Sequence, residues 1–487
     1  MLILLSWNTA AQPSYNGKHI YLQTTSRDKE ITWCDQSHYI VTYFHKASAS
    51  GIRHHFIVQD MTTNNAKQFS LDAYYSSAFV LHSTTITIND MKIDGNGECW
   101  FCGKKSTETE AIYYPGIGWM YETDDYGIVG HFSLYDVISG SGNYELFTIY
   151  GTGGLTRIEP RGNYGQVFMV GYPYGCTFDA SGNPTASCLV GLGYNSFTAQ
   201  WKYDIVHPSD PNELFTDVTD AGAGIAVVSR FKNDHYHIGL RHTKKGMLGT
   251  PNLFSFLYNI NIYDMQLATT GSGTPVAWRK DADPVFLAAG NYGSALSLAY
   301  SCNNIANGIA SFELAVPNIG DVQITAAKHI ISYSYLELID CKAYSNNFAT
   351  DFLIYDNSSN QYGISSIDWL SGSTSFTGAS CSESDYIWQS ITSYDSISSN
   401  GNNTYSFRYI AGHKPDNTPV FTKYHSLPVI SKCIDNTTYS IQNLTIPTTS
   451  PVVKMVYLDG TYNNYPTTPI NGSFSSTIVY QNALCTF

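Results

Sequence analysis

The chain has 487 residues, which is too long for one small hydrophobic core, so we expect either several domains or one large repeat architecture. Charged residues make up only 13 % of the sequence and aromatic residues 14 %, a composition that excludes an intrinsically disordered chain. The formal net charge of −13, without a run of Lys or Arg, disfavours a nucleic-acid-binding protein, and no stretch of 18 apolar residues predicts a membrane-spanning helix.

The N-terminal segment MLILLSWNTAAQP combines a short apolar run with small residues at positions 9–11. Small residues precede signal-peptidase cleavage sites, although this segment has no basic start and is shorter than a complete signal peptide. We interpret residues 1–11 as the remnant of a signal peptide and expect a secreted, periplasmic or cell-surface protein. The alternative is a disordered or docked N-terminus.

Residues 89–103, NDMKIDGNGECWFCG, predict a β-hairpin. Apolar residues alternate with polar or small ones on both sides of Asp94-Gly95-Asn96-Gly97, and these turn residues readily adopt the positive φ angles of a tight hairpin. The segment reduces to a template. An apolar anchor residue, Met91, is followed six residues later by Gly97 and then by a strand rich in aromatic residues.

The template recurs along the chain. The seven anchors are Cys34, Met91, Ile158, Val218, Leu287, Cys341 and Ser396. Their mean separation is (396 − 34)/6, or about 60 residues, and each interval leaves room for two more strands, as in HYHIGLRH and FSFLYNINIYDM after Val218. Four short antiparallel strands per repeat are typical of the blade of a β-propeller.

We therefore predict an all-β fold, a single β-propeller of about seven four-stranded blades. Six or eight blades are the alternative counts, and separate β-sandwich domains are the competing architecture. Because a ring avoids open sheet edges only when it is closed, we expect a strand from one terminus to complete the blade at the other. The candidates are residues 18–23 (KHIYLQ) and 452–458 (VVKMVYL). We assign residues 12–450 to the propeller and 451–487 to a C-terminal closing strand and tail.

The stretch from Met91 to Gly103, with Asp94, Gly97 and Trp100, resembles the propeller repeat of bacterial two-component sensor ectodomains. More broadly, INDMKIDGNGECWFCG followed by GIVGHFSLYDV is similar to uncharacterised secreted β-propeller proteins of anaerobic gut bacteria. The resemblance is specific over residues 86–137 and elsewhere covers only the pattern of the repeat. It implies a propeller fold and export, and it implies no activity.

Ten cysteines in 487 residues are too few for a scaffold built on disulfides. Cys176 and Cys188 lie symmetrically about Gly182, so a hairpin that turns at this glycine would place them opposite one another as a disulfide. Cys99 and Cys102 form a CxxC sequence. Residues three apart in a strand point to opposite faces, whereas a redox CxxC lies at the start of a helix, so we predict structural roles for both.

Charged residues directly precede five of the anchors: Asp90, Arg157, Asp217, Asp340 and Asp395. If the anchors begin the strands that line the central channel, these side chains take equivalent positions around one mouth of it. The carboxylates then either bind a cation or a hydroxyl-rich ligand, or accept backbone N–H bonds and hold the entry to each blade. We expect no cofactor other than a structural cation in this channel.

Other candidate site residues give weaker signals. His235 and His237 would share one face of a strand, where they are weak candidates for metal ligands without an identifiable third. Exposed aromatic residues on a propeller face can stack on sugar rings, but Trp201, Trp278 and Trp369 are more typical of packing between blades. Sequence patterns of nucleophilic, phosphate-binding or metalloprotease sites, such as GxSxG and HExxH, do not occur.

These observations favour a secreted, non-enzymatic binding or interaction protein. We expect a monomer that meets a glycan or a surface protein through the loop face of the propeller. The alternative is a carbohydrate-active enzyme, a glycoside hydrolase or polysaccharide lyase with carboxylates at the channel mouth, because paired acids leave no local sequence pattern.

Overall fold

The structure is a computed structural model of the whole chain, and its strands run through almost all of the described sequence. The described residues are 18–21, 31–34, 39–48, 51–60, 63, 65–72, 84–114, 118–161, 166–180, 182–195, 199–221, 224–232, 234–244, 254–261, 286–289, 295–302, 308–318, 321–331, 336–343, 349–357, 360–368, 378–381, 387–397, 404–413, 419–425, 435–437, 440–443, 452–457 and 465–478. None of these residues form a helix long and apolar enough to cross a lipid bilayer.

Within these residues the strands form seven antiparallel sheets. We number them in chain order, starting from the sheet that begins with β2, and call β2, β6, β10, β14, β18, β22 and β26 their first strands. Sheet 1 contains β2 (Ile31–Cys34), β3 (Tyr39–Ser48), β4 (Gly51–Asp60), β5 (Ala66–Asp72) and β34 (Thr477–Ile478). Sheet 2 contains β6 (Thr84–Ile93), β7 (Glu98–Tyr114), β8 (Gly118–Ser133), β9 (Ser141–Ile149) and β33 (Ile470–Ser475). Sheet 3 contains β10 (Thr152–Arg161), β11 (Gln166–Pro173), β12 (Cys188–Asn195), β13 (Gln200–Val206) and β32 (Tyr465–Thr467).

The other four sheets repeat this plan. Sheet 4 contains β14 (Glu213–Ala221), β15 (Gly224–Phe231), β16 (Asp234–Lys244), β17 (Phe254–Asn261) and β31 (Val452–Tyr457). Sheet 5 contains β18 (Phe286–Ala289), β19 (Ala295–Cys302), β20 (Gly308–Asn318), β21 (Asp321–Ile331) and β30 (Ser440–Asn443). Sheet 6 contains β22 (Leu336–Ala343), β23 (Ala349–Asp356), β24 (Gln361–Asp368), β25 (Gly378–Cys381) and β29 (Asp435–Thr437). Sheet 7 contains β26 (Ile387–Ile397), β27 (Thr404–His413), β28 (Pro419–His425) and β1 (Lys18–Tyr21).

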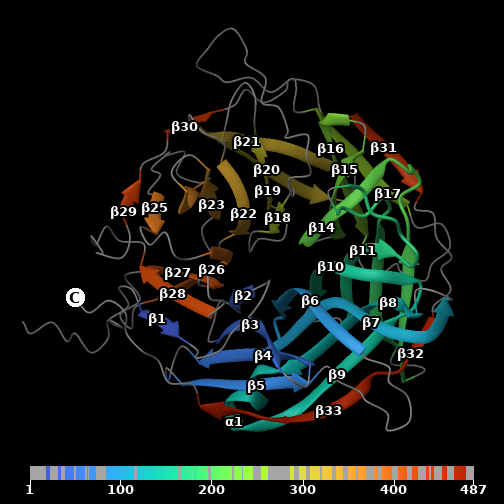
Figure 1. Cartoon of the computed structure of the whole chain (residues 1–487). Helices are drawn as coiled ribbons and strands as arrows, with labels where there is room; N and C mark the ends of the chain where they lie inside the picture. Colours follow the sequence, from blue (N-terminus) through green and yellow to red (C-terminus); the bar gives the residue numbers. More distant parts are fainter. Residues whose placement is uncertain are drawn as a thin grey trace, which may run out of the picture.

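The sheets are arranged around a common centre as a β-propeller (Figure 1). The first strand of each sheet contacts the first strands of its two neighbours, and the series includes a contact between β26 and β2. Each predicted anchor residue lies in the first strand of a different sheet, from Cys34 in β2 to Ser396 in β26. The seven anchors therefore mark the innermost strands, and six of them, all except Ser396, are apolar or cysteine.

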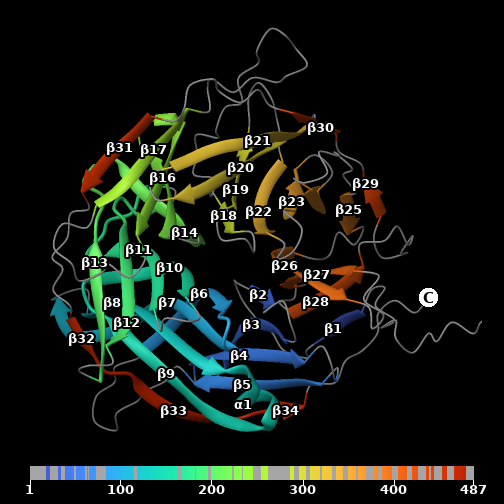
Figure 2. The same cartoon turned by 180° about the vertical axis from the view of Figure 1, so that it is seen from behind.

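A segment near the C-terminus runs around the outside of the ring (Figures 1 and 2). Its strands β29, β30, β31, β32, β33 and β34 each add a fifth, outermost strand to one sheet, and they visit sheets 6, 5, 4, 3, 2 and 1 in that order. We call these six strands the belt. Val452–Tyr457 of VVKMVYL, one of the two candidates for closing the ring, form β31, which pairs with β17 in sheet 4 and so does not close the ring as predicted.

The other candidate, KHIYLQ, supplies β1. Its residues Lys18–Tyr21 pair antiparallel with β28, so sheet 7 joins a strand near the N-terminus to three strands from residues 387–425. Sheet 7 is the one sheet of the described residues that receives no belt strand, and β1 takes the position that the belt strands leave there.

The predicted hairpin at residues 89–103 is confirmed as β6, a tight turn and β7. The backbone N–H of Gly97 donates to the carbonyl of Asp94, and Gly97 has a φ of 79°, which favours glycine. The carboxylate of Asp94 accepts the N–H groups of Asn96 and Glu98 at 2.8 and 3.0 Å, and the indole of Trp100 at 3.3 Å. A single aspartate thus fixes both the turn and the first aromatic side chain after it.

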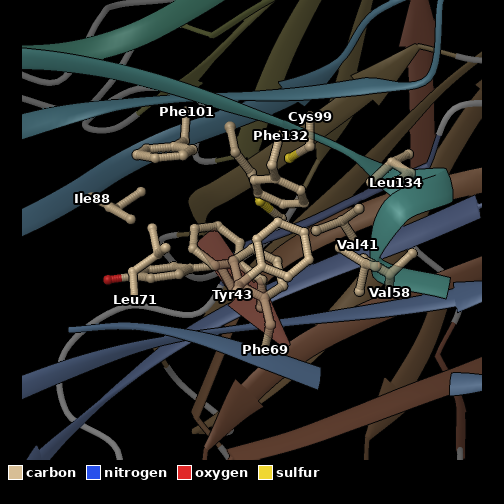
Figure 3. Packing of buried hydrophobic residues seen from close by; sticks show 14 of the residues in the cluster. Val41, Tyr43, Val58, Phe69, Leu71, Ile88, Cys99, Phe101, Phe132 and Leu134 are labelled. Atoms are coloured by element: carbon tan, nitrogen blue, oxygen red, sulfur yellow. The ribbon is translucent and has the colours of Figure 1, made fainter. Parts of the chain in front are cut away.

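Sheets 1 and 2 enclose a large aromatic core (Figure 3). Phe132 packs edge-on against Phe69 and Phe56, with ring centroids 4.6 and 5.0 Å apart. Phe474 from the belt stacks on Phe69 at 4.2 Å. The short helix α1 (Leu134–Ser139), capped by Ser133, adds Leu134 to this core. The belt is therefore joined to the ring by side-chain packing as well as by backbone pairing.

The cysteines of sheet 2 and of the hairpin at residues 174–187 are free thiols. Cys99 packs into the core between sheets 1 and 2, whereas Cys102 packs between sheets 2 and 3, so the two thiols point to opposite faces as predicted. Phe178 pairs with Pro184, and this register sets Cys176 against Ala186 rather than Cys188. The turn is centred one residue before Gly182, and this shift removes the symmetry on which the predicted disulfide depended.

Candidate functional site

The first strands of five sheets share a β-bulge at the same place. The register shifts between Ile88 and Asp90 in β6, and equivalent shifts precede Arg157, Asp217, Asp340 and Ser390. A β-bulge bends the strand and redirects the side chains beside it. The bulges therefore give four of the five predicted site residues a common position on the innermost strands. The equivalent position in β26 is Ser390, and Asp395 lies five residues further along.

Asp90 and Asp340 use this position in the same way. Each accepts the N–H of the residue that follows it, Met91 or Cys341, at 2.9 Å. Their second oxygens accept N–H groups from the first strand of the next sheet, from Ile158 at 3.0 Å and from Ile391 at 2.9 Å. These contacts agree with the structural interpretation of the aspartates, in which they accept backbone bonds, and they show that the bonds join neighbouring sheets.

Charged side chains from four sheets meet at the centre of the ring. Burial disfavours the charge of Arg157, but the carboxylates of Asp90, Asp217 and Asp340 raise its pKa. These three aspartates come from sheets 2, 4 and 6, so the predicted residues of four sheets are within electrostatic reach of one another. Asp340 is half-buried, and its desolvation raises its pKa despite the N–H of Ile391 and the charge of Arg157.

Lys92 supplies a second cation to this centre. Its ammonium donates to Glu159 at 2.6 Å, and the two side chains are 12 % and 14 % exposed. Burial lowers the pKa of Lys92, but Glu159, Asp217 and Asp90 together raise it well above its usual range. The central carboxylates therefore already face two cations of the chain itself, and a bound cation would have to compete with them. Their binding role stays a prediction.

Several predicted site residues lie outside the described side chains. Asp395 belongs to β26, and His235 and His237 belong to β16, but only their backbone is described. Trp278 and Trp369 lie outside the described residues. Trp201 packs against the core between sheets 2 and 3, in agreement with the packing role predicted for it. In the part of the chain that the structure describes, no three His, Cys, Asp or Glu side chains gather as a set of metal ligands.

A histidine bridges two carboxylates on sheet 2. His131 contacts Glu98 through Nδ1 and Glu145 through Nε2, both at 3.1 Å, and its ring stacks on Trp100 with centroids 4.2 Å apart. Burial lowers the pKa of His131, but the hydrogen bonds to both carboxylates raise it above its ordinary value. The three residues come from β7, β8 and β9, so cross-strand register brings them together.

Exposed tyrosines cluster where sheets 2 and 3 meet. The tyrosine cluster consists of Tyr126, Tyr150 and Tyr174, of which Tyr150 is 60 % exposed and Tyr174 51 % exposed. Tyr126 lies parallel to Tyr174, with centroids 5.6 Å apart and planes at 16°, and edge-on to Tyr150 at 5.2 Å and 69°. The hydroxyl of Tyr174 donates to Asp124 at 2.6 Å.

Hydrogen bonds to neighbouring strands hold the backbone at two residues of the tyrosine cluster. Tyr150 lies between β9 and β10, where its carbonyl accepts the hydroxyl of Tyr203 at 3.3 Å. Tyr174 directly follows β11, and its N–H donates to the carbonyl of Gly151. The rings of Tyr150 and Tyr174 thus remain exposed, with the half-buried Tyr126 against them, although hydrogen bonds hold the backbone at both exposed tyrosines. Sequence reasoning did not find this cluster, because its members are separated along the chain and join only through the contact of two sheets.

Comparisons with known proteins do not identify the chain. No protein-family model matches it, and no curated protein matches it. Among solved structures it is similar to Sqt1 of Chaetomium thermophilum, with 9 % identity, a TM-score of 0.39, and coverage of 82 % of this chain and 83 % of that one. It is also similar to the Dos1 propeller, with 8 % identity, a TM-score of 0.32, and coverage of 84 % and 95 %. The propeller assignment therefore rests on the sheet order and contacts described above.

Proposed function

We propose that this protein is an exported, non-enzymatic binding protein whose ring of sheets presents the tyrosine cluster to a protein partner. The observation that carries the proposal is the exposure of Tyr150 and Tyr174 on ordered backbone between two packed sheets. Tyrosine is enriched at the energetically dominant positions of protein interfaces, because it buries a large apolar area and still offers a hydroxyl. Export rests on the apolar N-terminal run and on the resemblance to secreted propellers.

The seven described sheets are, in this proposal, the complete set of blades, and β1 closes the ring. Two observations support the count. The seven sequence anchors fall one to a sheet, and β2 contacts β26 across the junction between the chain ends. A closed ring holds its surface side chains in a fixed arrangement, and a preordered surface loses less entropy when it binds.

The orientation of the rings favours a protein over a glycan. A sugar ring stacks on one open aromatic face, whereas Tyr126 and Tyr150 stand at 69° to one another and form a corner. We therefore favour a protein partner over a glycan ligand and over an enzymatic function.

The test presents the protein in parallel to envelope proteins of its source cells and to a glycan array. The variants are Tyr150→Ala/Tyr174→Ala and, as a control, Tyr135→Ala, which removes a tyrosine of α1 that is even more exposed, at 70 %. We expect one protein to be retained by the wild type and by Tyr135→Ala and to be lost from the double variant. Retention that survives the double variant would exclude the tyrosine cluster, and cluster-dependent binding of glycans alone would replace the protein partner.

A further inference from the structure

An acidic side chain, that of Asp124, lies beside the tyrosine cluster. Asp124 accepts the hydroxyl of Tyr174 at 2.6 Å and lies two residues before Tyr126 on β8. Burial together with the charge of Asp124 raises the pKa of Tyr126. An aromatic corner beside a carboxylate is thus present at the surface.

The described charged side chains next to the cluster on β7 and β8 are those of Lys104, Lys105, Asp124 and Asp125. One of the two lysines, Lys104, is already paired with Asp125 at 3.0 Å. The whole chain has a net charge of −13, which attracts a basic partner over distances up to about one Debye length, roughly 10 Å at moderate salt.

We propose that the tyrosine cluster binds a cationic side chain, Lys or Arg, of the partner, with the cation against the ring faces of Tyr126 and Tyr150 and its charge opposite Asp124. This inference rests on the proposed function and names the chemistry of the partner at the same surface. Aromatic faces are negative, so they attract a cation within about 6 Å of the ring centroid. Rings that meet at 69° offer a cation two faces at once, which a single flat ring does not.

An apolar side chain would fit this surface less well. The ring edges are rimmed by hydroxyl groups, and the carboxylate of Asp124 would lose hydration against an apolar ligand without gaining a partner. A cationic head instead compensates the carboxylate, while the aliphatic stem of Lys or Arg covers the exposed ring of Tyr150.

The test uses small probes that differ only in charge. Nα-acetyl-arginine amide is titrated against the protein at low ionic strength, and Nα-acetyl-citrulline amide, which has nearly the same shape and no charge, is titrated in parallel. Binding is followed by the chemical shifts of labelled tyrosine rings. We expect the arginine probe to bind at least about tenfold more tightly than the citrulline probe, and to be weakened by added salt.

Three variants assign the binding to the cluster. Asp124→Asn, which removes the charge and keeps the shape, should weaken the arginine probe by about threefold to tenfold. Tyr150→Ala should weaken it by about tenfold or more, since it removes one of the two faces of the corner. Tyr135→Ala should leave it unchanged. Equal binding of the two probes, or equal binding to the wild type and Asp124→Asn, would overturn the cationic ligand.

The failure of this inference differs from a failure of the proposed function. If the arginine and citrulline probes bind equally while capture of the partner still depends on Tyr150 and Tyr174, the cluster binds a partner through other chemistry. If capture is indifferent to both tyrosines, the proposed function fails whatever the probes do.

Discussion

The two faces of sheet 2 pack against their neighbouring sheets through different kinds of contact. The face toward sheet 1 is apolar and aromatic, with Phe101 and Phe132 packed among the rings of sheet 1. The face toward sheet 3 also has an apolar core, but polar links join the two first strands there. These are the bond from Ile158 to Asp90 and the ion pair of Lys92 with Glu159.

This contrast indicates that apolar packing mainly stabilises the contact between sheets, whereas polar links fix the angle between them. Apolar burial is strong but has no direction, so it holds two sheets together without fixing how one is turned against the other. Hydrogen bonds and buried ion pairs are directional and tolerate little misalignment, so they can set the angle between sheets. The junction of sheets 2 and 3 is also where the tyrosine cluster is exposed. We infer that the polar links keep the members of the cluster in register.

The largest expected effect is on the apolar face. Phe132→Ala removes a side chain that is 1 % exposed and packs against Phe56 and Phe69, so it should lower the free energy of unfolding by about 4 kcal/mol. Phe132→Leu is the control and should cost about 1.5 kcal/mol at most, because it keeps most of the volume. Denaturant unfolding measures both, and losses of equal size would contradict packing as the main contribution.

The next effect concerns the buried ion pair. Lys92→Met leaves Glu159 buried without its cation, which should lower the free energy of unfolding by about 3 kcal/mol. The double variant Lys92→Met/Glu159→Leu removes both charges and should recover most of this loss. A double variant as unstable as the single one would show that the pair is not the source of the effect.

A smaller loss is expected at the inner aspartates. Asp90→Asn weakens the bonds from Met91 and Ile158 and should lower the free energy of unfolding by about 2 kcal/mol. Asp340→Asn disturbs the corresponding bonds from Cys341 and Ile391 and should have a similar effect. Widely different losses in denaturant unfolding would argue against equivalent roles in the two sheets.

The smallest effect is a dependence on pH at His131. Its pKa is raised in the folded protein, so its stabilisation is fully present below the unfolded pKa and is lost as the pH rises through the folded pKa. We expect a loss of about 1 kcal/mol, because the carboxylates of Glu98 and Glu145 are about one-third exposed. His131→Gln should flatten this pH dependence in thermal unfolding, and an unchanged slope would remove His131 as its cause.

Local chemistry explains what the sequence could predict. The turn at Asp94–Gly97 follows from residues that are adjacent in the chain. Anchors such as Met91, Ile158 and Val218 mark inner strands because apolar residues are needed where the sheets converge. In the last repeat, the position equivalent to Asp90 is occupied by Ser390 and not by Asp395. The hydroxyl of Ser390 donates to Asp340 at 3.1 Å. A serine serves there because the carboxylate comes from the neighbouring sheet.

Features that depend on distant pairing could not be predicted. The belt strands are two to six residues long, too short for a periodic pattern, and their partners are set by the completed ring. The bridge from Glu98 through His131 to Glu145 depends on cross-strand register, which becomes available only once β7, β8 and β9 are accepted as neighbours. The exposure of Tyr150 and Tyr174 likewise depends on how sheets 2 and 3 meet.

The central claim is that the tyrosine cluster is the surface that meets the partner. Site-specific photocrosslinking tests it most directly, with a photoreactive phenylalanine analogue in place of Tyr174 and, in a second preparation, in place of Tyr135. The account predicts a crosslinked partner protein from position 174 and none from position 135. Crosslinking from position 135 alone, or from neither position while the partner is still bound, would contradict it.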